Sequence, residues 1–206
     1  IAATLPRVAP AIAHGRVIVA HLGSGASLCA LQAGKSVDST MGFSPLDGIP
    51  MGTRPGAVDP GVLLYLVGQR NMTPAALEQL LYRESGLLAL SGISNDMRQL
   101  LQSPEPRARL AVDYFVYYVA KEIGALTAVL GGLDAVVFTA GIGENQVGLR
   151  QTICANLDQL GIRLDPTLNA QTRATEAAIS SSDSRVKILV IPTNEELVVA
   201  REVKRL

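Results

Sequence analysis

The first third of the chain alternates between apolar runs and short glycine-containing segments. Residues 17–22 form a largely β-branched run that ends at Gly23-Ser24-Gly25, and residues 26–31 form a second apolar segment. Gly34-Lys35 is typical of a turn, and residues 36–41 are long enough for a third strand. Apolar runs separated by turn residues are the pattern of paired strands, so we predict a three-stranded antiparallel meander.

Two helix starts follow a long segment that has no sustained period. Residues 42–59 are rich in glycine and proline, and a connection of this length favours a functional role. Asp59-Pro60 and Thr73-Pro74 each place a capping side chain before a proline, so a helix is predicted after each pair. The expected apolar stripes are Leu63, Leu64 and Val67 in the first helix and Leu77, Leu80 and Leu81 in the second. We interpret residues 85–98 as loop-rich.

The second half of the chain has the pattern of helices that alternate with buried strands. From Arg107 to Leu130 apolar residues recur at steps of three and four, which predicts the longest helix. Strands are predicted at 134–139 and 186–191, a tight turn at 140–143, helices from Glu144 and from Glu195 to about Arg205, and a polar surface segment at 169–185. A meander followed by helix–strand–helix–strand–helix predicts a mixed α/β fold with one sheet.

Composition limits the partners of the protein. The chain has 206 residues, of which 48% are hydrophobic, so a sizeable core can be buried. Its 18 basic residues balance 18 acidic ones without a basic cluster, which argues against nucleic acid or an anionic membrane as a partner. No apolar run reaches the roughly 18–20 residues of a membrane span, and the N-terminus lacks a signal-peptide layout. We therefore predict a cytoplasmic protein.

The two cysteines do not predict a metal site. Cys29 and Cys154 lie far apart in apolar surroundings, whereas a metal site needs more ligands at closer spacing. We expect two buried free thiols. The chain begins with Ile-Ala-Ala-Thr rather than Met, so we also expect a fragment or a processed product.

The first glycine-rich turn, at residues 22–27, follows the first apolar run. Glycines allow close approach of backbone N–H groups to a ligand, and successive N–H groups form an anion-binding concavity. A Gly-Ser-Gly hairpin turn of purely structural role fits the same residues. His21 ends the run beside this turn, where it either lines a nucleotide cleft or has a structural role.

The second glycine-rich turn, at residues 138–145, lies between a predicted strand and a predicted helix. This order places a helix N-terminus at the carboxyl end of a strand, where open α/β sheets bind ligands and the helix dipole favours phosphate. The segment lacks the third glycine of the dinucleotide fingerprint and the Gly-Lys-Ser/Thr of a P-loop. A tight strand–helix connection without a ligand remains the alternative.

Three further polar segments carry candidate chemistry. Glu195 and Glu196 follow Asn194, either as dipole compensation in a helix or as a ligand of Mg²⁺. Arg54 lies in the long glycine-rich loop, either as a surface charge or as a guanidinium clamp on a transferring phosphoryl group. Asp96 and Arg98 end a polar loop, and a local salt bridge accounts for them on physical grounds.

In combination, these segments resemble the acetate kinase family. The string at 21–27, His-Leu-Gly-Ser-Gly-Ala-Ser, is similar to the family's phosphate hairpin, and residues 41–54 resemble its Met-Gly-Phe/Leu-Thr-Pro-Leu-Glu-Gly…Met-Gly-Thr-Arg signature. Residues 91–98, 141–145 and 192–196 are similar to its later motifs in the same order. The resemblance spans about residues 13–206, and five ordered motifs are specific where each alone is weak.

The resemblance implies a fold and a reaction. The family belongs to the sugar kinase/Hsp70/actin superfamily, so we expect a ribonuclease H-like α/β domain with a mixed sheet flanked by helices. The implied reaction is reversible transfer of the ATP γ-phosphate to acetate, which gives acetyl phosphate and ADP. The implied cofactor is Mg²⁺, and the implied assembly is a homodimer through this part of the protein.

The resemblance also implies roles for individual residues. The segment that would bind the phosphates is His21, Leu22, Gly23, Ser24 and Gly25. The residues that would flank adenosine are Asp96, Met97, Arg98, Gly141, Ile142, Gly143, Glu144 and Asn145. Arg54 matches the arginine that stabilises the transferring phosphoryl group, and Glu195 matches the Mg²⁺ ligand.

The family pattern differs from this sequence in places. Asp47 stands where Glu is common, and Gly-Ala-Val-Asp-Pro at 56–60 replaces the frequent Gly-Asp-Ile-Asp-Pro. The family's amino-terminal domain is not in the sequence, so we expect residues 1–206 to be a single C-terminal nucleotide-binding domain that is inactive alone. The alternatives are a propionate or butyrate kinase, a non-catalytic nucleotide-binding module, and a plain dimerisation domain.

Overall fold

A computed structural model describes residues 1–194 and 203–204. In this part of the chain, six strands form one sheet of order β3-β2-β1-β4-β6-β5. The strands are β1 (Arg16–Leu22), β2 (Ala26–Gln32), β3 (Lys35–Ser39), β4 (Ala135–Thr139), β5 (Ala177–Ala178) and β6 (Lys187–Val190). The first three strands are antiparallel neighbours, so the predicted meander is confirmed, while β4 is parallel to β1 and β6 is parallel to β4.

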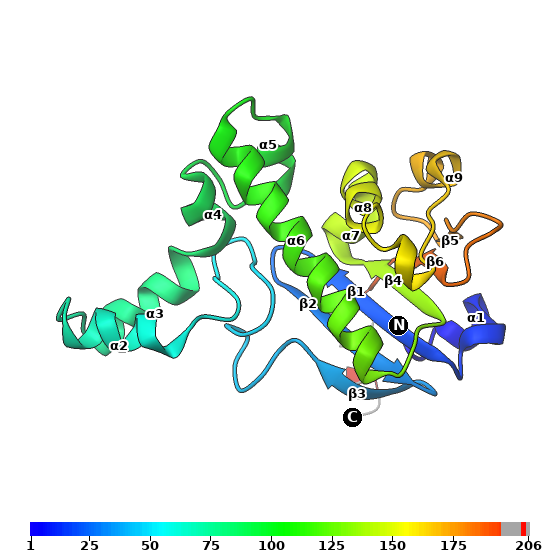
Figure 1. Ribbon diagram of the computed structural model, residues 1–206, viewed down its shortest axis with the longest axis horizontal. Coiled ribbons are helices and arrows are strands. Elements are labelled where there is room, and N and C mark those ends of the chain that lie inside the picture. Colours follow the sequence, from blue (N-terminus) through cyan, green and yellow to red (C-terminus); the bar gives the residue numbers. More distant parts are fainter. Residues whose placement is uncertain (195–202, 205–206) are drawn as a thin grey trace.

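Helices precede the sheet, cover it and connect its two halves (Figure 1). They are α1 (Leu5–Val8), η1 (Pro10–Ile12), α2 (Pro60–Gly68), α3 (Pro74–Arg83), α4 (Gly86–Ser91), α5 (Met97–Gln102), α6 (Pro106–Val129), α7 (Ala140–Asn145), α8 (Val147–Cys154), η2 (Asp158–Leu160) and α9 (Pro166–Gln171). α6 crosses one face of the sheet, and the α2–α3 pair extends away from it (Figure 1). None of the helices in the described residues is both long and apolar enough to cross a membrane.

The predicted helix starts are confirmed by their capping hydrogen bonds. The Asp59 carboxylate accepts from the backbone N–H of Gly61, and the Thr73 hydroxyl accepts from that of Ala76. The predicted stripe of α2 is wrong as a buried stripe, because no residue of α2 is buried and Leu64 is 73% exposed. The α2–α3 pair projects from the sheet, so the apolar residues of α2 have no core to pack against (Figure 1).

Three other local interpretations are corrected. Residues 85–98 are not loop-rich, since α4 and the start of α5 lie there. Residues 140–143 are not a tight turn before a helix, because α7 begins directly at Ala140. The surface segment at 169–185 contains β5 and the fully buried Asn169. The predicted last helix falls almost entirely outside the described residues.

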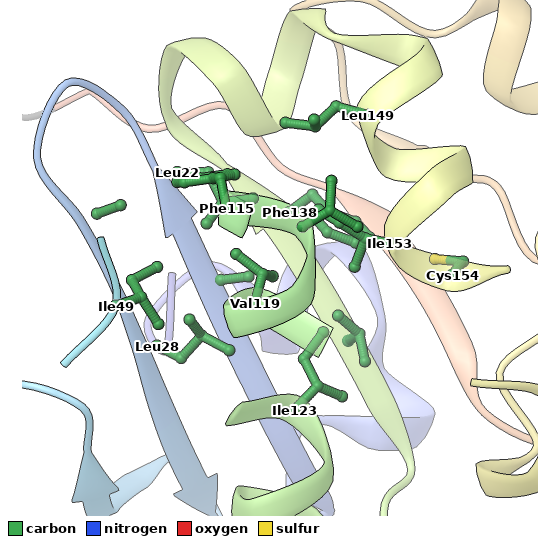
Figure 2. Close-up of a cluster of buried hydrophobic side chains, with 14 of the residues drawn as sticks. Leu22, Leu28, Ile49, Phe115, Val119, Ile123, Phe138, Leu149, Ile153 and Cys154 are labelled. Atoms are coloured by element: carbon green, nitrogen blue, oxygen red, sulfur yellow. The ribbon is translucent and has the colours of Figure 1, made fainter. Parts of the chain in front are cut away.

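The central strands are buried on both faces. Along β4, Val136 and Phe138 pack into one apolar cluster, whereas Ala135 and Val137 pack into another on the opposite face. Figure 2 shows Phe115, Val119 and Ile123 of α6 in the first cluster, near Phe138 and the β1–β2 side chains. A fully buried side chain of this kind contributes roughly 1.5–3 kcal/mol, so α6 and the sheet stabilise each other strongly.

The two cysteines are free thiols, as predicted, but only one is buried. Cys154 lies in the core, where burial raises the pKa of its thiol to about 12, and Cys29 is half-buried.

An ion pair joins the N-terminal ends of β1 and β4. The Arg16 guanidinium donates to the Asp134 carboxylate at 2.8 Å, and this pair links the start of β1 to the start of β4.

Candidate functional site

Three parallel strands end at the same edge of the sheet. In the register of the sheet, His21 of β1 lies beside Thr139 of β4, and Phe138 lies beside Val190 of β6. The chain leaves these strand ends as the Gly23–Gly25 turn, as helix α7 and as the segment 191–194. The two predicted glycine-rich turns and the segment that leads to Glu195 are therefore neighbours in space.

Two adjoining pockets lie at this edge. The first has a volume of about 790 Å³ and is lined by His21, Gly23, Ser24, Gly25, Ala26, Ser27, Met41, Ala140, Gly141, Glu144 and Thr193. The second has a volume of about 490 Å³ and is lined by Gly23, Ser24, Asn95, Asp96, Met97, Arg98, Gly141, Ile142, Asn145 and Gln146. They share Gly23, Ser24 and Gly141, so together they form one elongated cleft.

The Gly23–Gly25 turn begins and ends with glycine, and the absence of a side chain at each end lets other groups approach its backbone closely. The N–H of Gly23 donates to the carbonyl of Gly25 at 3.1 Å, which closes the turn. A Cβ atom at Gly25 would lie 2.5 Å from Nη2 of Arg54. A side chain at position 25 would therefore push the Arg54 guanidinium away from the turn.

Arg54 is brought to this turn by the loop that carries it. The N–H of Gly52 donates to the carbonyl of Ser24 at 3.1 Å, and Nη1 of Arg54 donates to the carbonyl of Pro45 at 2.9 Å. Within the described residues no carboxylate forms an ion pair with Arg54. The position of the guanidinium beside the Gly23–Gly25 turn suits a clamp on an anion bound at that turn.

Helix α4 determines where the Arg54 segment lies. The N–H groups of Leu87 and Leu88 donate to the carbonyls of Met51 and Gly52 at 2.9 and 3.0 Å. Gly86, with φ of +62°, packs so closely that a Cβ atom would lie 2.6 Å from the carbonyl oxygen of Arg54. The N-terminus of α4 thus holds the loop through its backbone.

Asp96 and Arg98 form the local ion pair that their spacing favoured. Asp96 caps α5 by accepting from the N–H of Arg98 at 2.9 Å, and Nη2 of Arg98 donates to its carboxylate at 2.6 Å. The side-chain hydrogen bond from Arg98, followed by the backbone one, lowers the pKa of Asp96. The carboxylate is therefore ionised at neutral pH, at the wall of the second pocket.

Helix α7 forms the shared wall of the two pockets. Gly141 faces open space, because no atom outside its own helical turn lies within 4 Å of an added Cβ atom, whereas Gly143 packs against Phe138 and the carbonyl of Ala20. The Glu144 carboxylate is buried and accepts from the N–H of Thr193 at 3.0 Å. This bond connects α7 to the segment that leads to Glu195.

The structure places most, but not all, of the expected binding residues at the cleft. Leu22 and Gly143 are buried and line neither pocket, and Arg54 lies beside the glycine turn but lines neither pocket. The side chain of Met97 lies in the core although the residue borders the second pocket. Glu195 lies outside the described residues, so its expected role as a metal ligand stays a prediction. Among the described residues, no three His, Cys, Asp or Glu side chains are grouped closely enough to hold a metal.

Sequence reasoning missed several residues of this region. Met41, Asn95 and Thr193 line the cleft from within motif segments but were given no binding role, and Gln146 lines it one residue beyond the 141–145 motif. Arg150 was also missed, although it shares a face of α8 with the buried Ile153 and Cys154. A charged residue at a core-facing position was the signal that could have identified it.

The sheet order, the hairpin turn and the cleft across three strand ends define a ribonuclease H-like domain of the sugar kinase/Hsp70/actin superfamily. The sequence model of the acetokinase family matches residues 7–201, and the chain belongs to that family. The acetate kinase of Nitrobacter hamburgensis is 60% identical over 201 residues, which are 98% of this chain and 49% of that protein.

Solved structures agree with this assignment. The crystal structure of Porphyromonas gingivalis acetate kinase superposes with a TM-score of 0.92 at 37% identity, over 98% of this chain and 51% of that one. A propionate kinase from Francisella tularensis superposes with a TM-score of 0.84 at 41% identity, over 90% of this chain and 48% of that one. The chain thus spans about half the length of the relatives it matches.

Proposed function

We propose that this chain is the nucleotide-binding half of an ATP-dependent acetate kinase. In the whole enzyme a carboxylate oxygen of acetate attacks the γ-phosphorus of ATP. The bond from that phosphorus to the β–γ bridging oxygen breaks, and ADP leaves with the electron pair. The observation that carries the proposal is the approach of the Arg54 guanidinium to the Gly23–Gly25 turn at the edge where three strands end.

The cleft divides into two parts that suit the two ends of ATP. The phosphates are assigned to the first pocket, which the backbone of the glycine turn lines, and the Arg54 guanidinium beside Gly25 supplies positive charge next to that pocket. Adenosine is assigned to the second pocket, between α5 and α7, where the Asp96 carboxylate can accept hydrogen bonds from ribose hydroxyls. Phosphoryl transfer depends mostly on such positioning and charge neutralisation.

The residues of the first pocket fit a magnesium ion that accompanies ATP. Its lining carries the hydroxyls of Ser24, Ser27 and Thr193 and the carboxylate of Glu144, and oxygen is the ligand atom that Mg²⁺ prefers. We assign Glu195, two residues after Thr193, as the direct or water-mediated ligand. When bound, the ion neutralises charge on the phosphate oxygens.

Binding of Mg·ATP to the chain tests the proposed function. Calorimetry is expected to show saturable one-site binding that is weakened about tenfold or more by Gly141→Val, which places a side chain in the cleft, and by Asp96→Ala. The matched controls are Gly148→Val, another helical glycine with open space around it, and Asp165→Ala, another capping aspartate. Both controls should bind like the parent.

Absence of binding at millimolar nucleotide, in this chain and in the full-length protein, would contradict the assignment of the cleft. Trapping of acyl phosphate with hydroxylamine in the full-length protein separates an enzyme from a non-catalytic binding module. Competition among acetate, propionate and butyrate in the same assay separates acetate kinase from the sister kinase. The similarity to the Francisella tularensis propionate kinase favours testing that alternative first.

We further propose that the protein is cytoplasmic and that it forms a homodimer through helix α2. The observation in support is the exposure of its apolar side chains Val62, Leu64, Tyr65 and Val67, since exposed patches of this kind mark interaction sites. Sedimentation is expected to give about twice the chain mass of 21.7 kDa, and Leu64→Glu is expected to give a monomer. Leu110→Glu, at an exposed leucine of α6, is the control that should remain dimeric. A Leu64→Glu dimer would exclude α2 as the interface.

A further inference from the structure

Arg150 is a fully buried arginine that touches neither pocket. It lies on α8 and is 1% exposed, on the same face as the core residues Ile153 and Cys154. Burying a charged side chain is costly unless it is fully hydrogen-bonded. A well-packed hydrophobic side chain at this position of α8 would cost less free energy to bury, so stability alone does not account for the arginine.

All five N–H donors of Arg150 are used. Nη1 donates to the carbonyls of Gly143 and Glu144, both at 2.8 Å. Nε donates to Oδ1 of Asn169 at 2.8 Å, and Nη2 donates to the carbonyls of Asn169 and Thr172 at 3.2 and 2.7 Å. The guanidinium therefore connects the α7 backbone to the α9 region and remains charged at neutral pH, although burial lowers its pKa to about 10.

The two carbonyls that Arg150 holds belong to the last turn of α7. A cation at a helix C-terminus stabilises the unpaired carbonyls there and the helix dipole. The same short helix carries Gly141, Ile142 and Asn145, which line the second pocket. Its Glu144 carboxylate also accepts from the N–H of Thr193, at the start of the segment toward Glu195.

We propose that Arg150 is a positioning residue for the nucleotide, which acts through α7. Its hydrogen bonds to the Gly143 and Glu144 carbonyls fix the position of α7, which forms the wall of the pocket assigned to adenosine. Through the hydrogen bond between Glu144 and Thr193, they also fix the position of the segment that precedes Glu195. This inference rests on the proposed function, because it assigns the second pocket to adenosine. The Gly23–Gly25 turn and Arg54 are carried by other elements, so we expect phosphate binding to depend much less on Arg150 than adenosine binding does, although Ala140, Gly141 and Glu144 of α7 also line the first pocket.

The test compares two probes in the 206-residue chain, Mg·ADP and inorganic tripolyphosphate. Arg150→Met is expected to weaken Mg·ADP about tenfold while tripolyphosphate affinity stays within about twofold of the parent. The matched control is Ile153→Ala, which removes a buried apolar side chain of the same helix but keeps the hydrogen bonds of Arg150 to α7. It should lower the melting temperature and leave the ratio of the two affinities unchanged.

If Arg150→Met does not fold, Arg150→Lys decides the matter. Lysine keeps the charge, but its three donors on one nitrogen cannot serve α7, Asn169 and Thr172 together, so a loss specific to Mg·ADP is still expected. Equal losses for both probes, or Mg·ADP affinity within about twofold of the parent, would overturn the role of Arg150. A parent chain that binds neither probe would instead overturn the nucleotide function on which the role rests.

Discussion

Arg54→Ala in the full-length enzyme is expected to lower kcat by about 10³-fold or more and to raise the KM for ATP far less. The guanidinium lies beside the Gly23–Gly25 turn and has no carboxylate partner among the described residues. From this position the guanidinium can stabilise the negative charge on the oxygens of the γ-phosphoryl group most strongly in the transition state, when that group lies between ADP and acetate. An interaction that strengthens in the transition state appears in kcat rather than in KM.

Steady-state kinetics with both substrates varied provides the measurement. Arg54→Lys keeps the charge but not the planar fork, and it should recover only part of the lost rate. Arg109→Ala removes an exposed arginine of α6 that pairs with Asp113, and it should leave kcat unchanged. An unaltered kcat in Arg54→Ala would remove this residue from the mechanism.

Gly86→Ala is expected to destabilise the chain by about 3 kcal/mol or more. Residue 86 has φ of +62°, where an L side chain costs roughly 1–2 kcal/mol. The added Cβ atom would also lie 2.6 Å from the Arg54 carbonyl oxygen, 2.9 Å from the Arg54 nitrogen and closer still to the Met51 carbonyl oxygen. Backbone atoms cannot yield as a flexible side chain does, and overpacking adds about 1–3 kcal/mol.

Urea unfolding measures this loss of stability. Gly124→Ala, at an interior position of α6 with no atom within 4 Å of the new Cβ, should be neutral or stabilise by up to about 1 kcal/mol. A Gly86→Ala variant within about 0.5 kcal/mol of the parent would contradict the packing of α4 on the Arg54 segment. If Gly86→Ala remains folded in the full-length enzyme, a reduced kcat would indicate that the packing of α4 on the 51–54 segment also positions Arg54.

Local signals were sufficient where the interactions are local. The helix starts at Pro60 and Pro74 were predicted because the capping aspartate and threonine act on N–H groups two or three residues away. The meander was predicted because strands with short turns pair with their sequence neighbours. Long apolar periodicity was likewise sufficient for α6.

Local signals failed where distant groups decide the conformation. α4 begins at a glycine of positive φ whose neighbours bond to the carbonyls of the 51–52 segment, and no periodic pattern marks so short a helix. The glycines of 140–143 read as a turn, yet they are helical in α7, where Gly143 packs on β4 and Arg150 holds the last carbonyls. The carbonyl of Ala20 that Gly143 also packs against is distant in sequence, whereas Phe138 and Arg150 lie only five and seven residues from Gly143.

The sequence by itself determined the fold class, the family motifs and the chemical character of the site, because glycine turns, capping residues and apolar runs act over a few residues. Only the tertiary structure decided that Arg54 reaches the Gly23–Gly25 turn, that the Glu144 carboxylate accepts a hydrogen bond from the N–H of Thr193, and that apolar side chains of α2 stay exposed. Arg150 belongs to the same group, because its hydrogen bonds join residues up to 22 positions apart. Such contacts depend on how the elements pack against each other, which no local pattern specifies.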